Sequence, residues 1–125
     1  MNATFGMQLK EYRIRAELTL RECSISLGVD PSNWSKLERG INSAPKEEVL
    51  AKWAKFLKLS AEETQSFLDL AAISRREIPK DLASDEVVLN ALPVFFRAAR
   101  GAEMDDAKLA QFVDQVRKLH SPDKE

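Results

Sequence analysis

The most constraining feature of the sequence is the segment 19–40, in which two helix starts and two helix stops follow one another closely. Thr19 and Glu22 have the spacing of a capping box, in which each side chain accepts a hydrogen bond from the other residue's backbone N–H. Gly28 predicts the end of this first helix, because glycine readily adopts the left-handed backbone that closes a helix. A short helix is therefore expected between Thr19 and Gly28.

A second helix is expected to start at once. Asp30 can cap its first amides, Pro31 suits the first helical position, and Gly40 ends it. The apolar spacing predicts one small core shared by the two helices, made of Leu20, Cys23, Ile25, Leu27, Val29, Trp34 and Leu37. The second helix is left with a polar outer face of Ser32, Asn33, Ser35 and Lys36. This combination is typical of a helix-turn-helix.

Residues from about 5 to about 73 resemble the lambda-repressor-like, Xre/Cro-type DNA-binding domain. The signature is formed by Leu18-Thr-Leu-Arg-Glu22, Leu27-Gly-Val-Asp30 and Trp34-Ser-Lys-Leu-Glu-Arg-Gly40. The resemblance implies a five-helix domain whose helix at 31–39, the recognition helix, enters the major groove of double-stranded DNA.

The same resemblance implies a set of DNA contacts. Base contacts are expected from Ser32, Asn33, Lys36 and Asn42, and phosphate contacts from Arg13, Arg21, Ser35, Arg39, Ser43 and Lys46. For Asn42 the alternative is that it only bonds its own backbone in a turn. Arg13 is expected to pair with Glu38, either to orient Arg13 beside a phosphate or as a surface salt bridge worth ~0–1 kcal/mol. Lys46 opposes the dipole of the helix that follows it, which a phosphate partner would explain.

Helical spacing continues through the rest of the chain, so the predicted fold class is all-α. Helices are expected over 4–17, 46–57 and 60–73, and the second of these is expected to bury Val49, Leu50, Trp53, Ala54 and Leu57. The predicted organisation is a helix-turn-helix domain at 1–73, a connector at 74–83, two or three helices within 84–120 and a flexible tail at 121–125. A break is expected at Pro93.

The C-terminal helices carry more apolar surface than they can bury between themselves, which predicts an interface. The expected interface residues are Val88, Leu92, Phe95, Phe96, Leu109, Phe112, Val113 and Val116. A homodimer is the first interpretation. The alternative is that these helices fold back over the helix at 60–73 and complete a monomeric core.

Composition limits the classes of function. The net charge is −1, but residues 1–58 carry ten Lys and Arg against seven Asp and Glu, while residues 59–125 carry nine against thirteen. A basic front and an acidic rear suit a protein that presents one end to DNA. With a single histidine, His120, and a single cysteine, Cys23, neither an enzyme nor a metal or other cofactor is expected.

No apolar run approaches the roughly 20 residues that a membrane-spanning helix needs, and the first residues lack the features of a secretory signal. The chain is therefore expected in the cytoplasm. The first interpretation of its function is a homodimeric, sequence-specific repressor. The alternative is an antitoxin or adaptor that binds a toxin or another regulator through its C-terminal helices.

Overall fold

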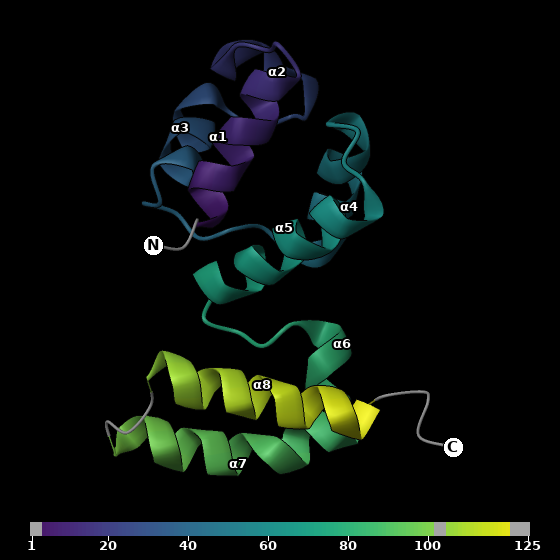
Figure 1. The fold of residues 1–125 in the computed structure, drawn as a ribbon. Helices are drawn as coiled ribbons and strands as arrows, with labels where there is room; N and C mark the ends of the chain where they lie inside the picture. Colours follow the sequence, from purple (N-terminus) through teal and green to yellow (C-terminus); the bar gives the residue numbers. More distant parts are fainter. Residues whose placement is uncertain (1–3, 102–104, 121–125) are drawn as a thin grey trace. The chain divides into compact units, whose positions relative to one another are not determined.

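The computed structural model describes residues 4–101 and 105–120, without the side chains of six residues in the last helix. Over this part the chain is all-helical, as predicted (Figure 1). The helices are α1 (Phe5–Arg15), α2 (Leu20–Ser26), α3 (Pro31–Glu38), α4 (Glu47–Phe56), α5 (Ala61–Ser74), α6 (Lys80–Ala83), α7 (Glu86–Arg100) and α8 (Asp106–His120). None of these helices is long and apolar enough to cross a membrane.

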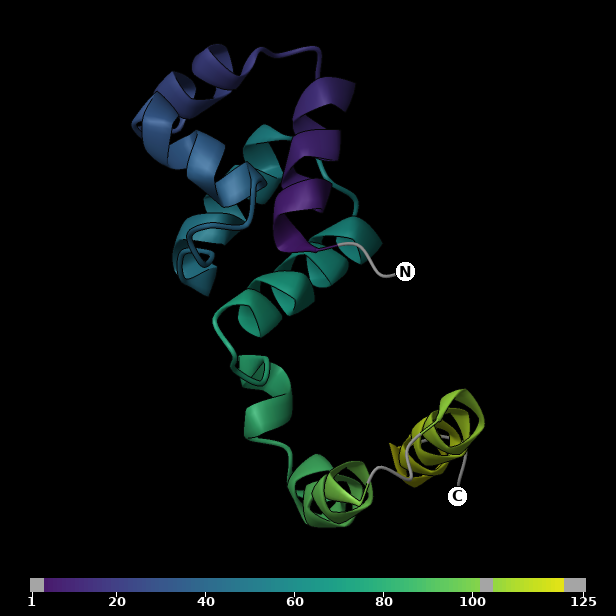
Figure 2. The same ribbon diagram turned by 90° about the vertical axis from the view of Figure 1, so that its left-hand side faces the viewer.

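The chain divides into two compact units, with the boundary between Pro79 and Lys80. In the first unit α1 packs on α3 and α5, α2 packs on α3, and α4 packs on α5 (Figures 1 and 2). In the second unit α7 packs against α6 and α8. Helix α6 lies in the segment expected to be a connector. It begins directly after Pro79, which suits a position just before a helix.

The helix starts follow the signals in the sequence. Both hydrogen bonds of the predicted capping box are present, from Glu22 N to Thr19 Oγ1 at 3.0 Å and from Thr19 N to Glu22 Oε1 at 2.9 Å. Ser60 and Glu63 form a second capping box at the start of α5. These bonds satisfy amides that the first turn of a helix leaves without partners.

The helix ends use two kinds of residue. Gly28 and Gly40 lie two residues after the ends of α2 and α3, and they have φ angles of 75° and 79°. At the same position after α1, α4 and α5 the left-handed residues are not glycine but Glu17, Lys58 and Arg76. At each of these five residues the next amide bonds back to the carbonyl five residues earlier, as in a Schellman motif.

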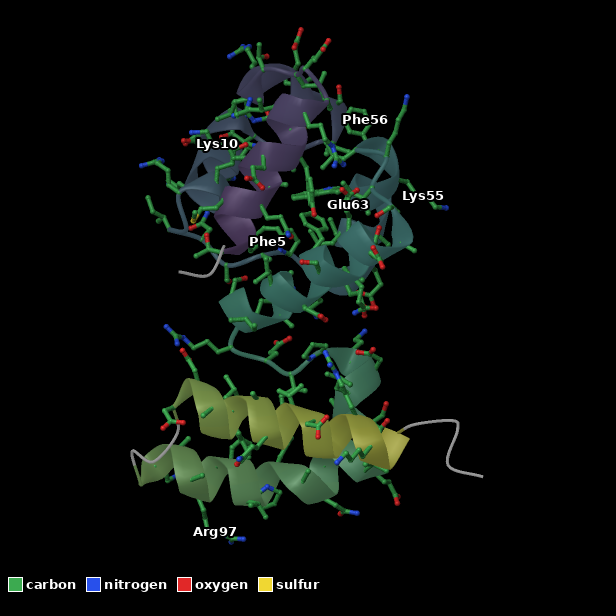
Figure 3. All side chains as sticks on the ribbon, in the orientation of Figure 1. Phe5, Lys10, Lys55, Phe56, Glu63 and Arg97 are labelled. Carbon is green, nitrogen blue, oxygen red and sulfur yellow. The ribbon has the colours of Figure 1, made fainter. Side chains whose placement is uncertain are left out.

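The core of the first unit is built from aromatic pairs. The rings of Trp34 and Trp53 lie 4.9 Å apart between centroids, and those of Phe5 and Phe67 lie 5.1 Å apart. Tyr12 meets Phe67 edge-on. Phe5, labelled in Figure 3, thereby joins the start of α1 to α5. The other pair joins α3 to α4.

Two predicted core residues are exposed, and these predictions were wrong. Ile25 is 58% exposed, because the inward side of α2 is occupied by the two preceding residues, Cys23 and Ser24, both fully buried. Val49 is 43% exposed, because α4 turns Leu50 and Trp53 inward and leaves Val49 at the edge of that face.

The break predicted at Pro93 is also absent, since α7 continues through this residue to Arg100. Pro93 is exposed, so water can reach the backbone carbonyl that a proline leaves without its helical partner. Seven residues of helix on either side are enough to carry the helix through this position.

An unpredicted close approach joins α1 to the end of α3. A Cβ atom added to Gly6 would lie 2.5 Å from the backbone carbonyl oxygens of both Leu37 and Glu38. Neither oxygen belongs to a flexible side chain, so only glycine allows α1 to lie this close to the end of the recognition helix.

Candidate nucleic-acid interface

Helix α3 separates an inward face from an outward face. Trp34 is fully buried and Leu37 is 6% exposed, whereas Ser32 and Asn33 are exposed and Lys36 is half-buried. Asp30 Oδ2 accepts hydrogen bonds from the amides of Ser32 and Asn33 at 3.0 and 3.3 Å. The cap therefore fixes the start of the helix, where the outward residues begin.

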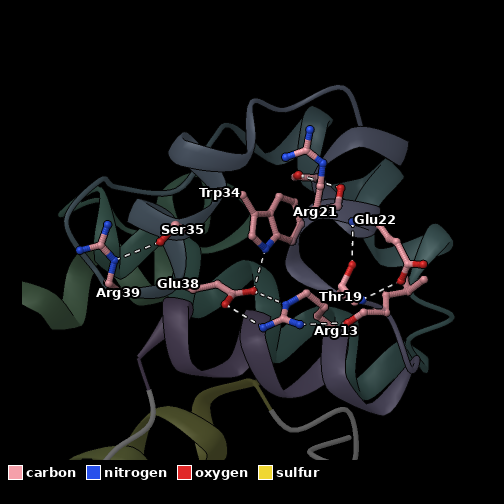
Figure 4. Close-up of polar contacts among 10 residues, drawn as sticks. Arg13, Thr19, Arg21, Glu22, Trp34, Ser35, Glu38 and Arg39 are labelled. Atoms are coloured by element: carbon pink, nitrogen blue, oxygen red, sulfur yellow. Dashed lines mark hydrogen bonds and ion pairs between the residues drawn. The ribbon is translucent and has the colours of Figure 1, made fainter.

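The other end of α3 is held by a buried ion pair (Figure 4). Arg13 Nε donates to Glu38 Oε2 at 2.6 Å, and Arg13 Nη2 donates to Glu38 Oε1 at 3.1 Å. Trp34 Nε1 donates to the same Oε2 at 2.7 Å, and Arg13 Nη1 donates to the carbonyl of Leu18 at 2.9 Å. The network ties α1, α3 and the turn before α2 into one assembly.

The predicted pairing of Arg13 with Glu38 is present, but neither interpretation of its role fits the geometry. The two side chains are only 11% and 6% exposed, so this is not a surface salt bridge. All three guanidinium nitrogens of Arg13 donate inside the protein, so the structure does not present Arg13 to a phosphate. Its hydrogen bonds to Glu38 raise the pKa of Arg13 further, so the guanidinium stays charged.

Four of the other predicted phosphate contacts are exposed: Arg21, Arg39, Ser43 and Lys46. Arg39 Nε donates to Ser35 Oγ at 3.1 Å, and Figure 4 shows its guanidinium pointing away from the buried network. Ser35 is half-buried, and its hydroxyl accepts this hydrogen bond from the Arg39 side chain. Lys46 precedes α4 and makes no side-chain cap bond.

The segment 41–46, called the wing loop below, is fixed at two places. The amides of Ile41 and Asn42 donate to the carbonyl of Lys36 at 2.9 and 3.3 Å. The amide of Ala44 donates to Ser74 Oγ at 2.9 Å, and Arg75 Nη1 donates to the carbonyl of Pro45. Ser43 lies between these fixed points, and both Asn42 and Ser43 are exposed.

Sequence reasoning missed three residues that shape this interface: Gly6, Ser74 and Arg75. Their roles depend on contacts with residues about 30 positions away along the chain. A glycine in the first turn of a predicted helix was the one local irregularity that could have indicated close packing.

Cys23 has no reactive environment. It is fully buried, and burial raises the pKa of its thiol to about 11, so the thiol is protonated at neutral pH. Within the part of the chain that the structure describes, no group of three or more His, Cys, Asp or Glu residues could hold a metal ion.

Comparison with known proteins agrees with this geometry. Residues 4–67, just over half of the chain, match the family model described as a helix-turn-helix domain. No curated protein and no solved structure matches the chain. The matched residues run from the cap of α1 into α5, and the match is consistent with the lambda-repressor-like resemblance of the sequence. The chain belongs to the helix-turn-helix domain family, which indicates a DNA-binding regulator.

Proposed function

We propose that this protein is a sequence-specific transcriptional regulator that acts as a homodimeric repressor in the cytoplasm. The observation that carries the proposal is the division of α3 into a buried face, with Trp34 and Leu37, and an outward polar face capped by Asp30. A rigid helix with small polar side chains at its start fits the major groove, where base edges are distinguished by hydrogen bonds.

The outward residues divide into base contacts and phosphate contacts. Asn33 pairs with adenine and Lys36 donates to guanine, while Ser32 and Asn42 make further contacts with base edges. Arg21, Arg39, Ser43 and Lys46 contact phosphates, and Ser35 supports Arg39. Arg13 is a positioning residue rather than a phosphate contact, because its donors hold Glu38 and Leu18.

Selection of bound sequences from random DNA tests this proposal. We expect Asn33→Ala and Lys36→Ala each to weaken binding to the selected sequence by ~1–3 kcal/mol and to relax base choice at one position in each half-site. Lys46→Ala should weaken binding to all sequences alike. The charge control is Lys55→Ala, on the outer side of α4 (Figure 3), which should change neither. If both α3 variants select the wild-type motif, the assignment of base contacts is wrong.

The proposal of a homodimer rests on the second unit. No described residue of α7 is buried, and Leu89, Val94 and Phe96 are 42, 57 and 40% exposed. On α8, Leu109 and Val113 are 41 and 40% exposed. Of the predicted interface residues, Val88, Leu92 and Phe95 are half-buried, while the side chains of Phe112 and Val116 lie outside the described residues. Exposed apolar surface on this scale suits an interface.

A second copy of the chain would cover this surface and serve the proposed function. A two-fold dimer presents two recognition helices to half-sites about 34–36 Å apart along B-DNA, which doubles the contacts of one small domain. We expect the full chain to sediment as a dimer at micromolar concentration. A chain ending at Pro79 should sediment as a monomer.

Point variants in α7 test the proposed dimer interface directly. Leu89→Gln with Phe96→Gln removes two apolar side chains from α7 and should weaken the dimer at least about tenfold, since burying one such side chain contributes ~1.5–3 kcal/mol. The control Arg97→Gln removes a charge from the same helix, and we expect it to leave dimerisation unchanged. A full-length monomer, or equal dimerisation of the shortened chain, would rule out this interface.

The same exposed surface also favours a second candidate function, an antitoxin or adaptor whose C-terminal helices bind another protein. A neighbouring toxin-like reading frame would support it. A chain that shifts no DNA, its own promoter included, would point to a pure interaction role.

A further inference from the structure

We propose that Ser74 and Arg75 are positioning residues for the wing loop, and that they set DNA affinity and base choice at Asn42 without touching DNA. The inference rests on the proposed DNA-binding function. It follows from the alternation of fixed and exposed residues in the wing loop. Ala44 and Pro45 are held by the end of α5, while Asn42, Ser43 and Lys46 around them are exposed.

The Ser74 side chain is oriented by its own helix and accepts a hydrogen bond from the wing loop. Its Oγ donates to the carbonyl of Ala71 at 2.8 Å, one turn earlier in α5, which orients the oxygen lone pairs. The same Oγ accepts the amide of Ala44 at 2.9 Å. Ala44 is only 5% exposed, so without Ser74 its N–H would be buried without an acceptor unless the loop moved.

Arg75 adds a second bond next to the first. Its Nη1 donates to the carbonyl of Pro45, and its Nε pairs with Glu77 at 3.1 Å. The side chain is 18% exposed, and two of its three nitrogens, Nε and Nη1, donate hydrogen bonds within the protein. Pro45 has no N–H, so its carbonyl is its one backbone hydrogen-bonding group.

These two bonds complete the fixation of the wing loop. The first residues of the wing loop are tied to Lys36 of the recognition helix. This tie fixes Asn42 only from the N-terminal side of the loop. The bonds from Ala44 to Ser74 and from Arg75 to Pro45 fix the loop on the C-terminal side of Asn42. A loop fixed on both sides before it meets DNA loses less conformational entropy on binding, which raises affinity and keeps one side chain opposite one base.

The test uses the full chain with Ser74→Ala and, separately, Arg75→Gln. Each variant should bind the selected sequence about fivefold to tenfold more weakly. Base choice should relax at the position read by Asn42 and stay unchanged at the positions read by Asn33 and Lys36. In Ser74→Ala the backbone amide of Ala44 should also exchange with solvent at least about tenfold faster, a readout that needs no DNA.

Arg76→Gln is the matched control. Arg76 is the exposed neighbour of Arg75, so its replacement removes the same charge and leaves the bond to Pro45 in place. It should weaken binding to all sequences alike or not at all. A double-mutant cycle compares Ser74→Ala alone with Ser74→Ala in a chain that also carries Asn42→Ala. In that second chain Ser74→Ala should reduce DNA affinity little further.

The outcomes separate the two proposals. If the wild-type chain selects a motif but Ser74→Ala and Arg75→Gln bind it with wild-type affinity and base choice, the positioning role is overturned and the DNA-binding proposal stands. A lower melting temperature with an unchanged motif would assign both residues to stability alone and overturn it too. If the wild-type chain selects no DNA, the proposed function fails, and the positioning role fails with it.

Discussion

Replacing Trp34 by alanine is expected to lower the free energy of unfolding by ~3–5 kcal/mol. Trp34 is fully buried, stacks on Trp53 at 4.9 Å between ring centroids, and donates its indole N–H to Glu38. Alanine would leave a cavity in the centre of the first unit, and the total stability of a domain this size is only about 5–15 kcal/mol. Denaturant unfolding followed by circular dichroism measures the loss.

Trp34→Phe is the matched variant, because it keeps an aromatic ring on Trp53 and removes the donor to Glu38. We expect it to lose clearly less stability than Trp34→Ala. A Trp34→Ala protein that melts like the wild type but no longer binds DNA would instead place this side chain in the groove and contradict the buried position.

The recognition helix was predictable from the sequence because its determinants are local. Asp30, Pro31 and Gly40 act within one helix, and the spacing of Trp34 and Leu37 marks its inward face. The same logic failed at Ile25, where the helix has only two turns and the inward side was already filled by its neighbours. Apolar character alone does not say which side of so short a helix is inside.

Long-range contacts were the part of the interface that the sequence did not reveal. The roles of Gly6 and Ser74 become visible only when α1 and α5 are placed against the end of α3 and the wing loop. The end of α1 was located only approximately, because a glutamate such as Glu17 does not indicate a left-handed backbone in the way a glycine does. The Arg13–Glu38 pair was predicted from the family, but its burial was not.

Because the Arg13–Glu38 pair is buried, we expect a large loss of stability when Arg13 is replaced. Arg13→Met keeps the volume of the side chain and leaves the carboxylate of Glu38, 6% exposed, without its charged partner. Removing one member of a buried ion pair is strongly destabilising, so we expect a loss of ~3–5 kcal/mol in the free energy of unfolding. Denaturant unfolding of the purified variants gives the value directly.

The double variant Arg13→Met with Glu38→Gln separates the unpaired charge from the lost packing. Glutamine removes the negative charge but keeps an oxygen that can accept the indole N–H of Trp34, so at least ~2 kcal/mol of the loss should return.

The surface control is Arg15→Met. Hydrogen bonds from Arg15 hold the pKa of Glu63 at about 2, so the Arg15–Glu63 pair is charged at neutral pH. Its side chains are 50% and 31% exposed. Water can replace the lost partner there, so Arg15→Met should cost far less. Equal losses for the two arginine variants would mean that Arg13 and Glu38 act as an ordinary surface pair, and the fixed end of the recognition helix would need another explanation.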